Sequence, residues 1–281
     1  MTKTSKIVLA LIAVLALAVV GGYLGSGFRG SPAAAGETGQ GSFIEAIKER
    51  GELRVGVAIA PPMTIQNADG TLGGANLIPL QQLADELGVK LVPVAAEWKN
   101  IVAGLQADRY DFAANLDYTV ERSLAIQFTD PVYSYPGVFV VKAGSKHVTA
   151  DDVIKDGGQI SVAQGAAPAA ALGQFTGKIM PMDSYANAIS AVQANRAIAE
   201  FTDLPTAESQ ALADDSLKII VPEPSIFESS TGYGVPADAD PRSLQIVNIA
   251  IDRAKSEGVL TKAYAEANYV EVGNLGDLRK K

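Results

Sequence analysis

Residues 53–59, with the sequence LRVGVAI, alternate between aliphatic side chains and small or polar ones. A period of two residues is typical of a β-strand that buries one face. An apolar stripe at helical spacing follows, and it consists of Leu77, Leu80, Leu83, Ala84 and Leu87. Asn76 stands at the position of a helix cap, and Gly88 is a typical helix terminator. The sequence therefore predicts a strand followed by an amphipathic helix.

The same alternation continues through the rest of the chain. Further strands are predicted at residues 89–94, 138–141, 160–163 and 217–221. Helical patterns begin at Trp98, Ser184 and Leu244. Strands that alternate with helices indicate α/β units with mostly parallel sheets, in which ligands lie beyond the carboxyl ends of the strands.

Composition excludes several functions. The 281 residues suggest about two domains, and 23 basic against 31 acidic residues give a net charge of −8. Charge-driven binding of nucleic acid needs clustered Lys and Arg, so we expect no nucleic-acid partner. The absence of Cys excludes thiolate nucleophiles and Cys-ligated metals. The only His, His147, is expected to be exposed, and no metal site or cofactor is predicted.

The N-terminus resembles an export signal. Lys3 and Lys6 precede the aliphatic run 7–20, and apolar character continues to Phe28. Such a run is typical of a signal peptide, but about 20 apolar residues also suffice to span a bilayer. We therefore expect residues 1–29 to be a signal peptide or an N-terminal membrane anchor, and residues 30–41 to be a linker. The body would be periplasmic or extracytoplasmic, either secreted or anchored by residues 7–28.

Seven segments resemble, in family order, the extracytoplasmic solute-binding proteins of polar amino-acid ABC transporters. They are GELRVGV (51–57), DGTLGG (69–74), DFAANLDYTVER (111–122), FTDPVY (128–133), VAQG (162–165), TDLP (202–205) and GVLTKAY (258–264). Each motif is weak alone, but the ordered set spans nearly the whole exported body.

The resemblance implies a two-lobed α/β periplasmic-binding-protein fold, in which two mixed sheets flanked by helices are joined by two hinge strands. Lobe 1 would comprise residues 42–137 and 230–281, and lobe 2 residues 138–229. The implied function is capture of an amino acid or a related small zwitterion between the closing lobes. The protein would deliver this ligand to an ABC-transporter permease, without enzymatic activity or a cofactor, and we expect a monomer.

Two charged residues carry the implied ligand contacts. Arg122, three residues after Thr119, would hold the ligand carboxylate, because a guanidinium fork matches a carboxylate bidentately. Asp203 would neutralise the ligand amino group. The alternatives are a solvated helix arginine for Arg122 and a helix cap before Leu204 for Asp203.

The remaining site residues depart from the family pattern or have two interpretations. Trp98 would stack on the ligand or belong to a helix core. Gly165, Ala166 and Ala167 lack the usual hydroxyl donors, although their backbone N–H groups can still bind an anion. Asp117 replaces a small polar residue, and an acidic group there repels a second carboxylate unless it is protonated or meets a cation. Together with Asp203, Asp117 would favour a ligand with extra positive charge.

Two other functions remain open at this point. One is an exported cyclohexadienyl dehydratase acting on prephenate or arogenate, which is similar to this family and needs a general acid such as Asp117 or Glu228. The other is a ligand-sensing module held in the membrane by the N-terminal segment. Fold alone does not decide among these functions.

Overall fold

The computed structural model describes residues 41–269. The expected signal peptide or anchor (1–29), the linker up to residue 40 and the last part of lobe 1 after residue 269 lie outside the described residues. Among the helices within 41–269, none has the length and apolar character needed to cross a bilayer.

A mixed sheet organises the described chain. Its strands lie in the order β4 (Lys90–Ala95), β1 (Glu52–Val57), β5 (Phe112–Asp117), β12 (Glu228–Val235), β7 (Tyr133–Lys142), β10 (Ala199–Asp203), β8 (Ile160–Ala163) and β9 (Ile179–Met182). Pairs at both ends of this order are parallel, whereas β12 and β7 are antiparallel to their neighbours. The short strands β6 (Gln127–Phe128) and β11 (Leu217–Ile220) pair with β12 and β7.

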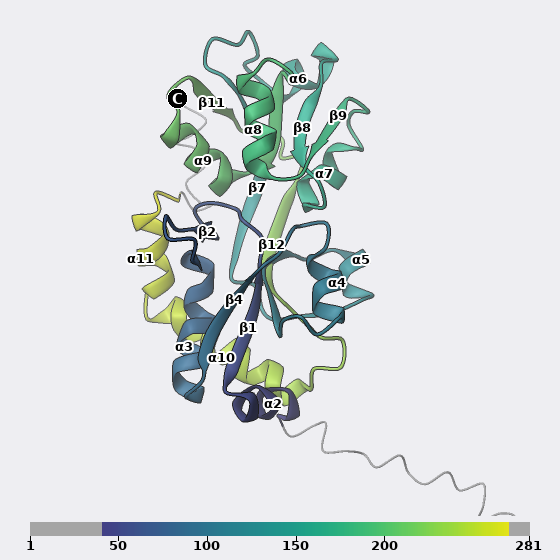
Figure 1. Ribbon diagram of the computed structural model, residues 1–281. Helices are drawn as coiled ribbons and strands as arrows, with labels where there is room; N and C mark the ends of the chain where they lie inside the picture. The colour runs from purple at the N-terminus through teal and green to yellow at the C-terminus, as the bar shows by residue number, and fades with distance from the viewer. Residues whose placement is uncertain (1–40, 270–281) are drawn as a thin grey trace, which may run out of the picture. The chain divides into compact units, whose positions relative to one another are not determined.

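Strands β7 and β12 join two groups of strands. The first part of β7, residues 133–136, pairs with β12, and its second part pairs with β10 and β11. Figure 1 shows both strands running between the upper and lower groups of elements. The predicted two-lobed α/β fold with two connecting strands is thereby confirmed.

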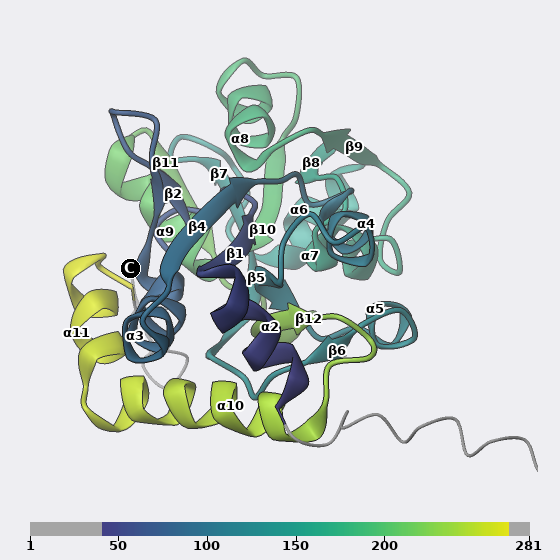
Figure 2. The same cartoon turned by 60° about the horizontal axis from the view of Figure 1, so that its bottom comes forward.

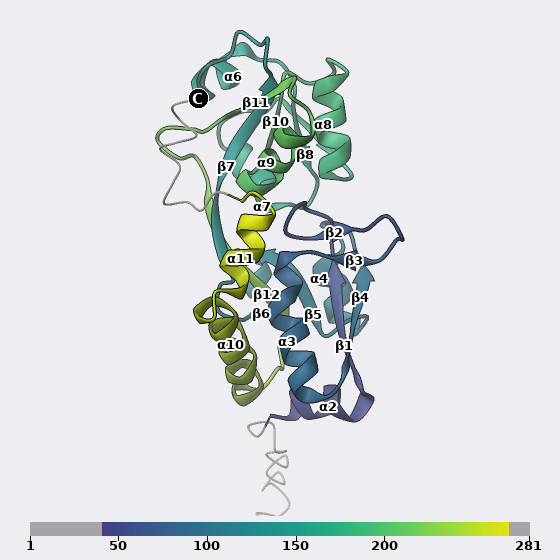
Figure 3. The ribbon, with the colours of Figure 1, turned by 90° about the vertical axis from the view of Figure 1, so that its left-hand side faces the viewer.

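The helices that follow the first strands pack with the C-terminal helices. Figures 2 and 3 show α10 beside α2 and α3, in agreement with the contacts among these helices. They share a core in which Leu80 and Leu83 of α3 lie with Val247 and Ile251 of α10. The helices of this group are α2 (Ser42–Arg50), α3 (Ile78–Leu87), α10 (Pro241–Ser256) and α11 (Val259–Glu266). On the other side of the sheet lie α4 (Ile101–Gln106) and α5 (Val120–Ser123).

The second group of strands buries both of its faces. Because side chains alternate along a strand, Val138 and Val140 of β7 enter one cluster while Phe139 and Val141 enter another. These faces are covered by α6 (Ala150–Asp156), α7 (Ala167–Leu172), α8 (Tyr185–Gln193) and α9 (Leu204–Ala213). Ser184 caps α8 as predicted, since its Oγ accepts a hydrogen bond from the N–H of Asn187.

The prediction that Asn76 caps the first long helix is wrong. Asn76 lies in the 3-10 helix η1 (Ala75–Leu77), which precedes α3, and its side chain is buried. Its Nδ2 donates to Asn115 Oδ1 at 2.7 Å, and its Oδ1 accepts from the hydroxyl of Tyr264 at 2.9 Å. Asn76 therefore links three elements of the core.

A small hairpin of β2 (Ile65–Gln66) and β3 (Leu72–Gly73) precedes η1 in the chain.

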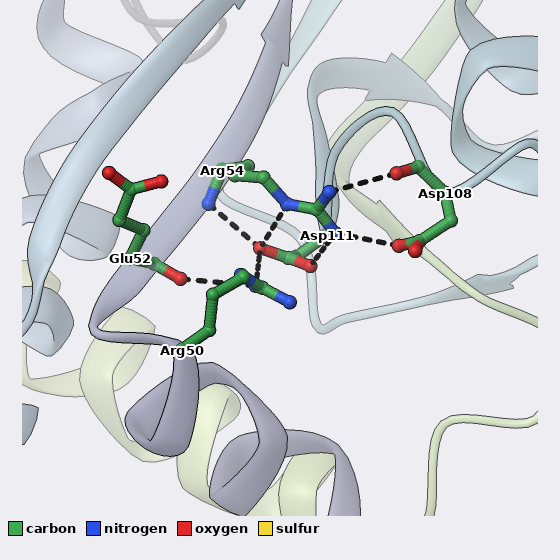
Figure 4. Close-up of polar contacts among 5 residues, drawn as sticks. All are labelled: Arg50, Glu52, Arg54, Asp108 and Asp111. Atoms are coloured by element: carbon green, nitrogen blue, oxygen red, sulfur yellow. Dashed lines mark hydrogen bonds and ion pairs between the residues drawn. The ribbon is translucent and has the colours of Figure 1, made fainter.

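Asp111, at the start of β5, connects that strand to β1 and α2 (Figure 4). Its carboxylate is 4% exposed and accepts from the backbone N–H of Arg54 at 2.8 Å and from Arg54 Nη2 at 2.8 Å. Arg50 at the end of α2 also donates to it. Asp108 pairs with the same Arg54 guanidinium, but its side chain is 87% exposed. The buried carboxylate of Asp111 thus accepts hydrogen bonds from two arginines, Arg50 and Arg54.

Asp111→Asn should lower the free energy of unfolding by about 2 kcal/mol, because hydrogen bonds to charged groups are worth about 1.5–3 kcal/mol. Asp108→Asn is the matched control, and it should cost less than about 1 kcal/mol because exposed ion pairs contribute little. Urea unfolding of the full chain measures both. Equal losses in the two variants would contradict the role given to the buried carboxylate.

Glu200 is a buried carboxyl group in the core of the second group of strands. Its side chain is 0% exposed, and neither of its oxygens has a hydrogen-bond partner among residues 41–269. Burial raises the pKa of Glu200 well above its usual value of 4.5, and Gln210 of α9 offsets this only in part. Burial of this kind disfavours the ionised form.

This burial makes stability depend on pH. Below pH 4.5 both states hold the proton, and at higher pH the unfolded chain releases it first, so the free energy of unfolding falls as pH rises until the pKa of folded Glu200 is reached. Glu200→Gln should remove a slope of up to about 1.4 kcal/mol per pH unit and stabilise the protein at pH 7. The exposed variant Glu49→Gln should leave the slope unchanged. Unfolding measured from pH 4 to pH 8 checks this, and parallel slopes for wild type and Glu200→Gln would refute it.

Candidate functional site

A row of polar side chains crosses the middle of the sheet on one face. Residues that oppose each other in antiparallel strands point to the same face, as do alternate residues of one strand. The opposed pairs are Asp117 with Thr231, Tyr133 with Thr231, Tyr135 with Ser229, and Gly137 with Asp203. The register therefore brings the two predicted carboxylates to one face, with the side chains of two tyrosines between them.

Asp117, at the end of β5, is fully buried in this row. Its Oδ1 accepts a hydrogen bond from the hydroxyl of Tyr135 at 2.6 Å. The backbone N–H of Ala167 also donates to the carboxylate, and the hydroxyl of Ser229, which donates to the carbonyl oxygen of Ser230 at 3.2 Å, lies beside it. Burial raises the pKa of Asp117, and the hydrogen bond from Tyr135 and the charge of Arg122 oppose this only in part. Asp117 is thus surrounded by donors from both groups of strands.

Arg122 links the two groups of strands. It lies in the short helix α5, whose cap is the predicted site residue Thr119: the Thr119 Oγ1 accepts from the N–H of Arg122 at 3.2 Å. The Arg122 Nη1 donates to the carbonyl oxygen of Asp117 at 3.1 Å, and its Nη2 donates to the carbonyl oxygen of Gly165 at 2.9 Å. The side chain is only 11% exposed, so Arg122 is not a solvated helix arginine.

Asp203 caps α9, because its Oδ1 accepts from the N–H of Thr206 at 2.8 Å. Its side chain also lies on the face of the sheet that carries the polar row. Burial raises the pKa of Asp203; hydrogen bonds from Thr206 and Tyr185 oppose the rise, and the charge of Asp117 adds to it.

Asp240 is an instructive comparison, because it caps α10 in the same way, through the N–H of Ser243 at 3.0 Å. Burial disfavours its charge too, but donors from Ser243, Phe43 and Gly41 outweigh this, and the pKa of Asp240 lies below its usual value. The pKa values of these two helix-capping aspartates therefore shift in opposite directions. Burial dominates for Asp203, whose surroundings also include a second carboxylate.

Trp98 lies at the contact between the two groups of strands. Its ring is 7% exposed and makes an edge contact with Tyr185, with ring centroids 6.2 Å apart. It shares a cluster with Ile101 of α4 and with Ala166 on the opposite side. The indole Nε1 is buried and finds no acceptor among residues 41–269. Trp98 precedes α4 and packs against buried residues of both groups of strands.

The loop of Gly165, Ala166 and Ala167 closes against Trp98 and Lys99. Gly165 has a φ of +85°, and a Cβ there would lie 2.6 Å from the backbone nitrogen of Lys99. A cavity of about 790 Å³ begins beside this contact. Among its lining residues are Trp98, Thr119, Arg122, Gly165, Ala166, Ala167, Phe227 and Glu228.

All eight predicted site residues therefore lie at one place. Six of them line the cavity, Asp117 contacts Arg122 and Ala167, and Asp203 interacts with Asp117 and Tyr185. Sequence reasoning missed three tyrosines and one threonine: Tyr133, Tyr135, Tyr185 and Thr231. The spacing of two residues between Tyr133 and Tyr135 indicates that both side chains lie on one face of a strand, and it could have identified them.

A second cluster of polar side chains surrounds His147. The prediction that His147 is exposed is wrong, because it is 5% exposed, with Nδ1 2.6 Å from Ser145 Oγ and Nε2 3.1 Å from Asp156 Oδ2. Ser145 Oγ also accepts from the backbone N–H of His147 at 3.2 Å, which places the serine in a local turn. The described part of the chain contains no group of three or more His, Asp or Glu that could hold a metal ion.

The fold and the polar cluster between its two groups of strands define a two-lobed solute-binding protein. A family model described as bacterial extracellular solute-binding proteins, family 3, matches residues 53–267. The chain belongs to this family.

Relatives and a solved structure agree with this assignment. A probable amino-acid ABC transporter periplasmic-binding protein of Sinorhizobium fredii is 27% identical over 189 residues, which cover 64% of this chain and 62% of the relative. An L-cystine-binding protein of Escherichia coli is 32% identical over 149 residues, 51% of this chain and 52% of the relative. The matches thus span about half to three fifths of these relatives. The crystal structure of an ancestral amino acid-binding protein, a precursor of cyclohexadienyl dehydratase, is similar with a TM-score of 0.72 and 27% identity, covering 79% of this chain and 98% of that one.

Gly165→Ala should separate the two lobes, because the new Cβ collides with the backbone at Lys99. Gly157→Ala is the matched control: its φ of +77° brings the same backbone strain, but no atom lies within 4 Å of the added Cβ. Because the chain has no Cys, spin labels can be placed at Gln106→Cys and Gln174→Cys. The distance between the labels should increase in Gly165→Ala and stay at the wild-type value in Gly157→Ala. An unchanged distance in both would show that this contact does not control closure.

Proposed function

We propose that the chain is the solute-binding component of an ABC transporter and captures a small solute of the amino-acid class, an amino acid or a related zwitterion. The observation that carries the proposal is the cluster of Arg122, Asp117 and Asp203, which come from both sides of one buried row. The names of the relatives support the solute class and a transporter permease as the partner.

The proposed division follows the sequence prediction, with residues 42–137 and 230–281 as lobe 1 and residues 138–229 as lobe 2. The solute would meet lobe 1 first, at Arg122 and Trp98. Lobe 2 would then close and bring Asp203 and the loop of Gly165, Ala166 and Ala167 into contact with the solute. Contacts available only in the closed state give the solute a differential affinity, and this affinity shifts the population toward closure.

The extracytoplasmic location follows from the family, whereas the form of attachment belongs to the proposal. Residues 7–28 would either be removed with a signal peptide or anchor the binding lobes at the membrane. A monomer is sufficient for the mechanism, because every proposed site residue comes from one chain. A binding role without catalysis is proposed because relatives of the chain are named as binding proteins.

The test is a binding screen on the full chain, kept in mild detergent because of its apolar N-terminus. The panel contains amino acids, opines, polyamines and prephenate. A ligand at 100 times its dissociation constant should add about 2.7 kcal/mol to the free energy of unfolding, which appears as a thermal shift. A response to prephenate alone, with turnover, would replace the proposal with the dehydratase, and no response to any compound would reject solute binding of this class.

Asp203→Asn should weaken the binding of any hit from that screen at least about tenfold, because a charged hydrogen bond is lost. Asp240→Asn alters the same kind of helix cap away from the cluster, so it should lower stability but leave the dissociation constant unchanged. Titration calorimetry on both variants measures this. Equal weakening by the two substitutions would mean that Asp203 acts only as a cap.

A further inference from the structure

Two of the five N–H donors of the Arg122 guanidinium are already used by the chain itself. Nη1 contacts the carbonyl oxygen of Asp117 at 3.1 Å and lies 3.7 Å from the carboxylate Oδ2 of the same residue. Nη2 donates to the carbonyl oxygen of Gly165 at 2.9 Å. The side chain is 11% exposed and lines the cavity, so an incoming anion would meet the fork beside acceptors that the chain already supplies.

The carboxylate of Asp117 also takes the other donors at this place. The Tyr135 hydroxyl and the backbone N–H of Ala167 donate to it, and the charge of Arg122 lies 3.7 Å away. A carboxylate offers about four acceptor positions, so the chain already fills a large part of them. A second carboxylate, brought by a solute, would have to displace Asp117 or share its donors, and two carboxylates in one buried site repel each other.

The charge balance of the cluster favours a cation. With both carboxyl groups ionised, Asp117 and Asp203 outnumber the single positive charge of Arg122, which leaves one negative charge. Lys99 does not correct this balance, because it lies at the surface and pairs with Glu97 at 3.3 Å and Asp183 at 3.4 Å. A buried excess charge is costly unless a partner of opposite sign arrives.

The uncharged surroundings fit the same kind of solute. Rings of Trp98, Tyr133, Tyr135 and Tyr185 lie around the two carboxylates, and aromatic faces attract desolvated cations. Thr231 is opposite both Asp117 and Tyr133, and its buried hydroxyl oxygen has no hydrogen-bond partner among residues 41–269. This unpaired oxygen, on the face that carries both carboxylates, is an acceptor for an ammonium or guanidinium N–H.

We propose that the solute of this cleft is a small organic cation, an amine or guanidine without a carboxylate, and that Asp117 occupies the position that a solute carboxylate would need. The inference rests on the proposed solute-binding function, because it concerns the same cleft. It keeps the capture of a small solute by the two lobes, but replaces the zwitterion by the corresponding amine, which lacks the carboxylate.

The experiment compares pairs of compounds that differ only by a carboxylate: cadaverine with lysine, and agmatine with arginine. Titration calorimetry on the wild-type full chain should give at least tenfold tighter binding for the amine of a pair. Asp117→Ser removes the internal carboxylate and frees its donors, so the preference should move at least tenfold toward the amino acid. Asp117→Asn keeps the shape of the side chain and should weaken the amines, which provides a second variant if Asp117→Ser does not fold.

The outcomes separate this inference from the proposed function. Tighter binding of lysine or arginine by the wild type, or equal affinity within each pair, would overturn the cation inference and leave solute binding intact. A preference that Asp117→Ser does not shift would also overturn it, because Asp117 would then not be the cause. A wild type that binds none of the four compounds nor any member of the wider panel would reject both proposals.

Discussion

Strand β7 changes its partner between Pro136 and Gly137, and this change of pairing places every element of the site. Before this point β7 is hydrogen-bonded to β12, and after it to β10. One strand therefore belongs to two packing units, and its alternation carries a single face from Tyr133 through Gly137 to Phe139. Gly137 is required because the ring of Phe201 packs over it, and a Cβ would lie 2.6 Å from that ring. The crossing is fixed by packing, and the carboxylates take their positions from it.

Much of the fold was predictable because it depends on the periodicity of apolar residues over short stretches of the chain. The alternation at 53–59, the stripe of α3 and the cap at Ser184 are short-range patterns, and the structure has the expected elements at these places. Asn76 shows the limit of such reasoning. An Asn before an apolar stripe is typical of a cap, but Asn115 and Tyr264, 39 and 188 residues away, take its side chain instead. Tertiary partners at that distance leave no trace in a local pattern.

The proximity of the residues proposed for the site was predictable, but their hydrogen bonds and pKa shifts were not. Arg122 and Asp203 were placed by ordered motifs, and they lie together as the motifs imply. Their hydrogen-bond partners could not be predicted, because these depend on which strands become neighbours. Asp203 and Asp240 make the point: each precedes a helix with a proline in its first turn, and each caps it. Burial raises the pKa of Asp203, and the charge of Asp117 adds to this, whereas the donors around Asp240 outweigh its burial, so the two pKa values shift in opposite directions.

The proposed selection by charge follows from contacts that the chain makes within the polar cluster. Arg122 reaches Gly165 across the cleft, and Ala167 donates to Asp117 in the same direction, so the chain supplies some closing contacts itself. Such contacts reduce the free energy that a solute must provide for closure. They also leave the cluster with uncompensated negative charge, which disfavours the empty closed state. The two effects oppose each other, and a solute that brings positive charge removes the penalty while keeping the contacts. Selection by charge is therefore a consequence of where the chain places its own carboxylate.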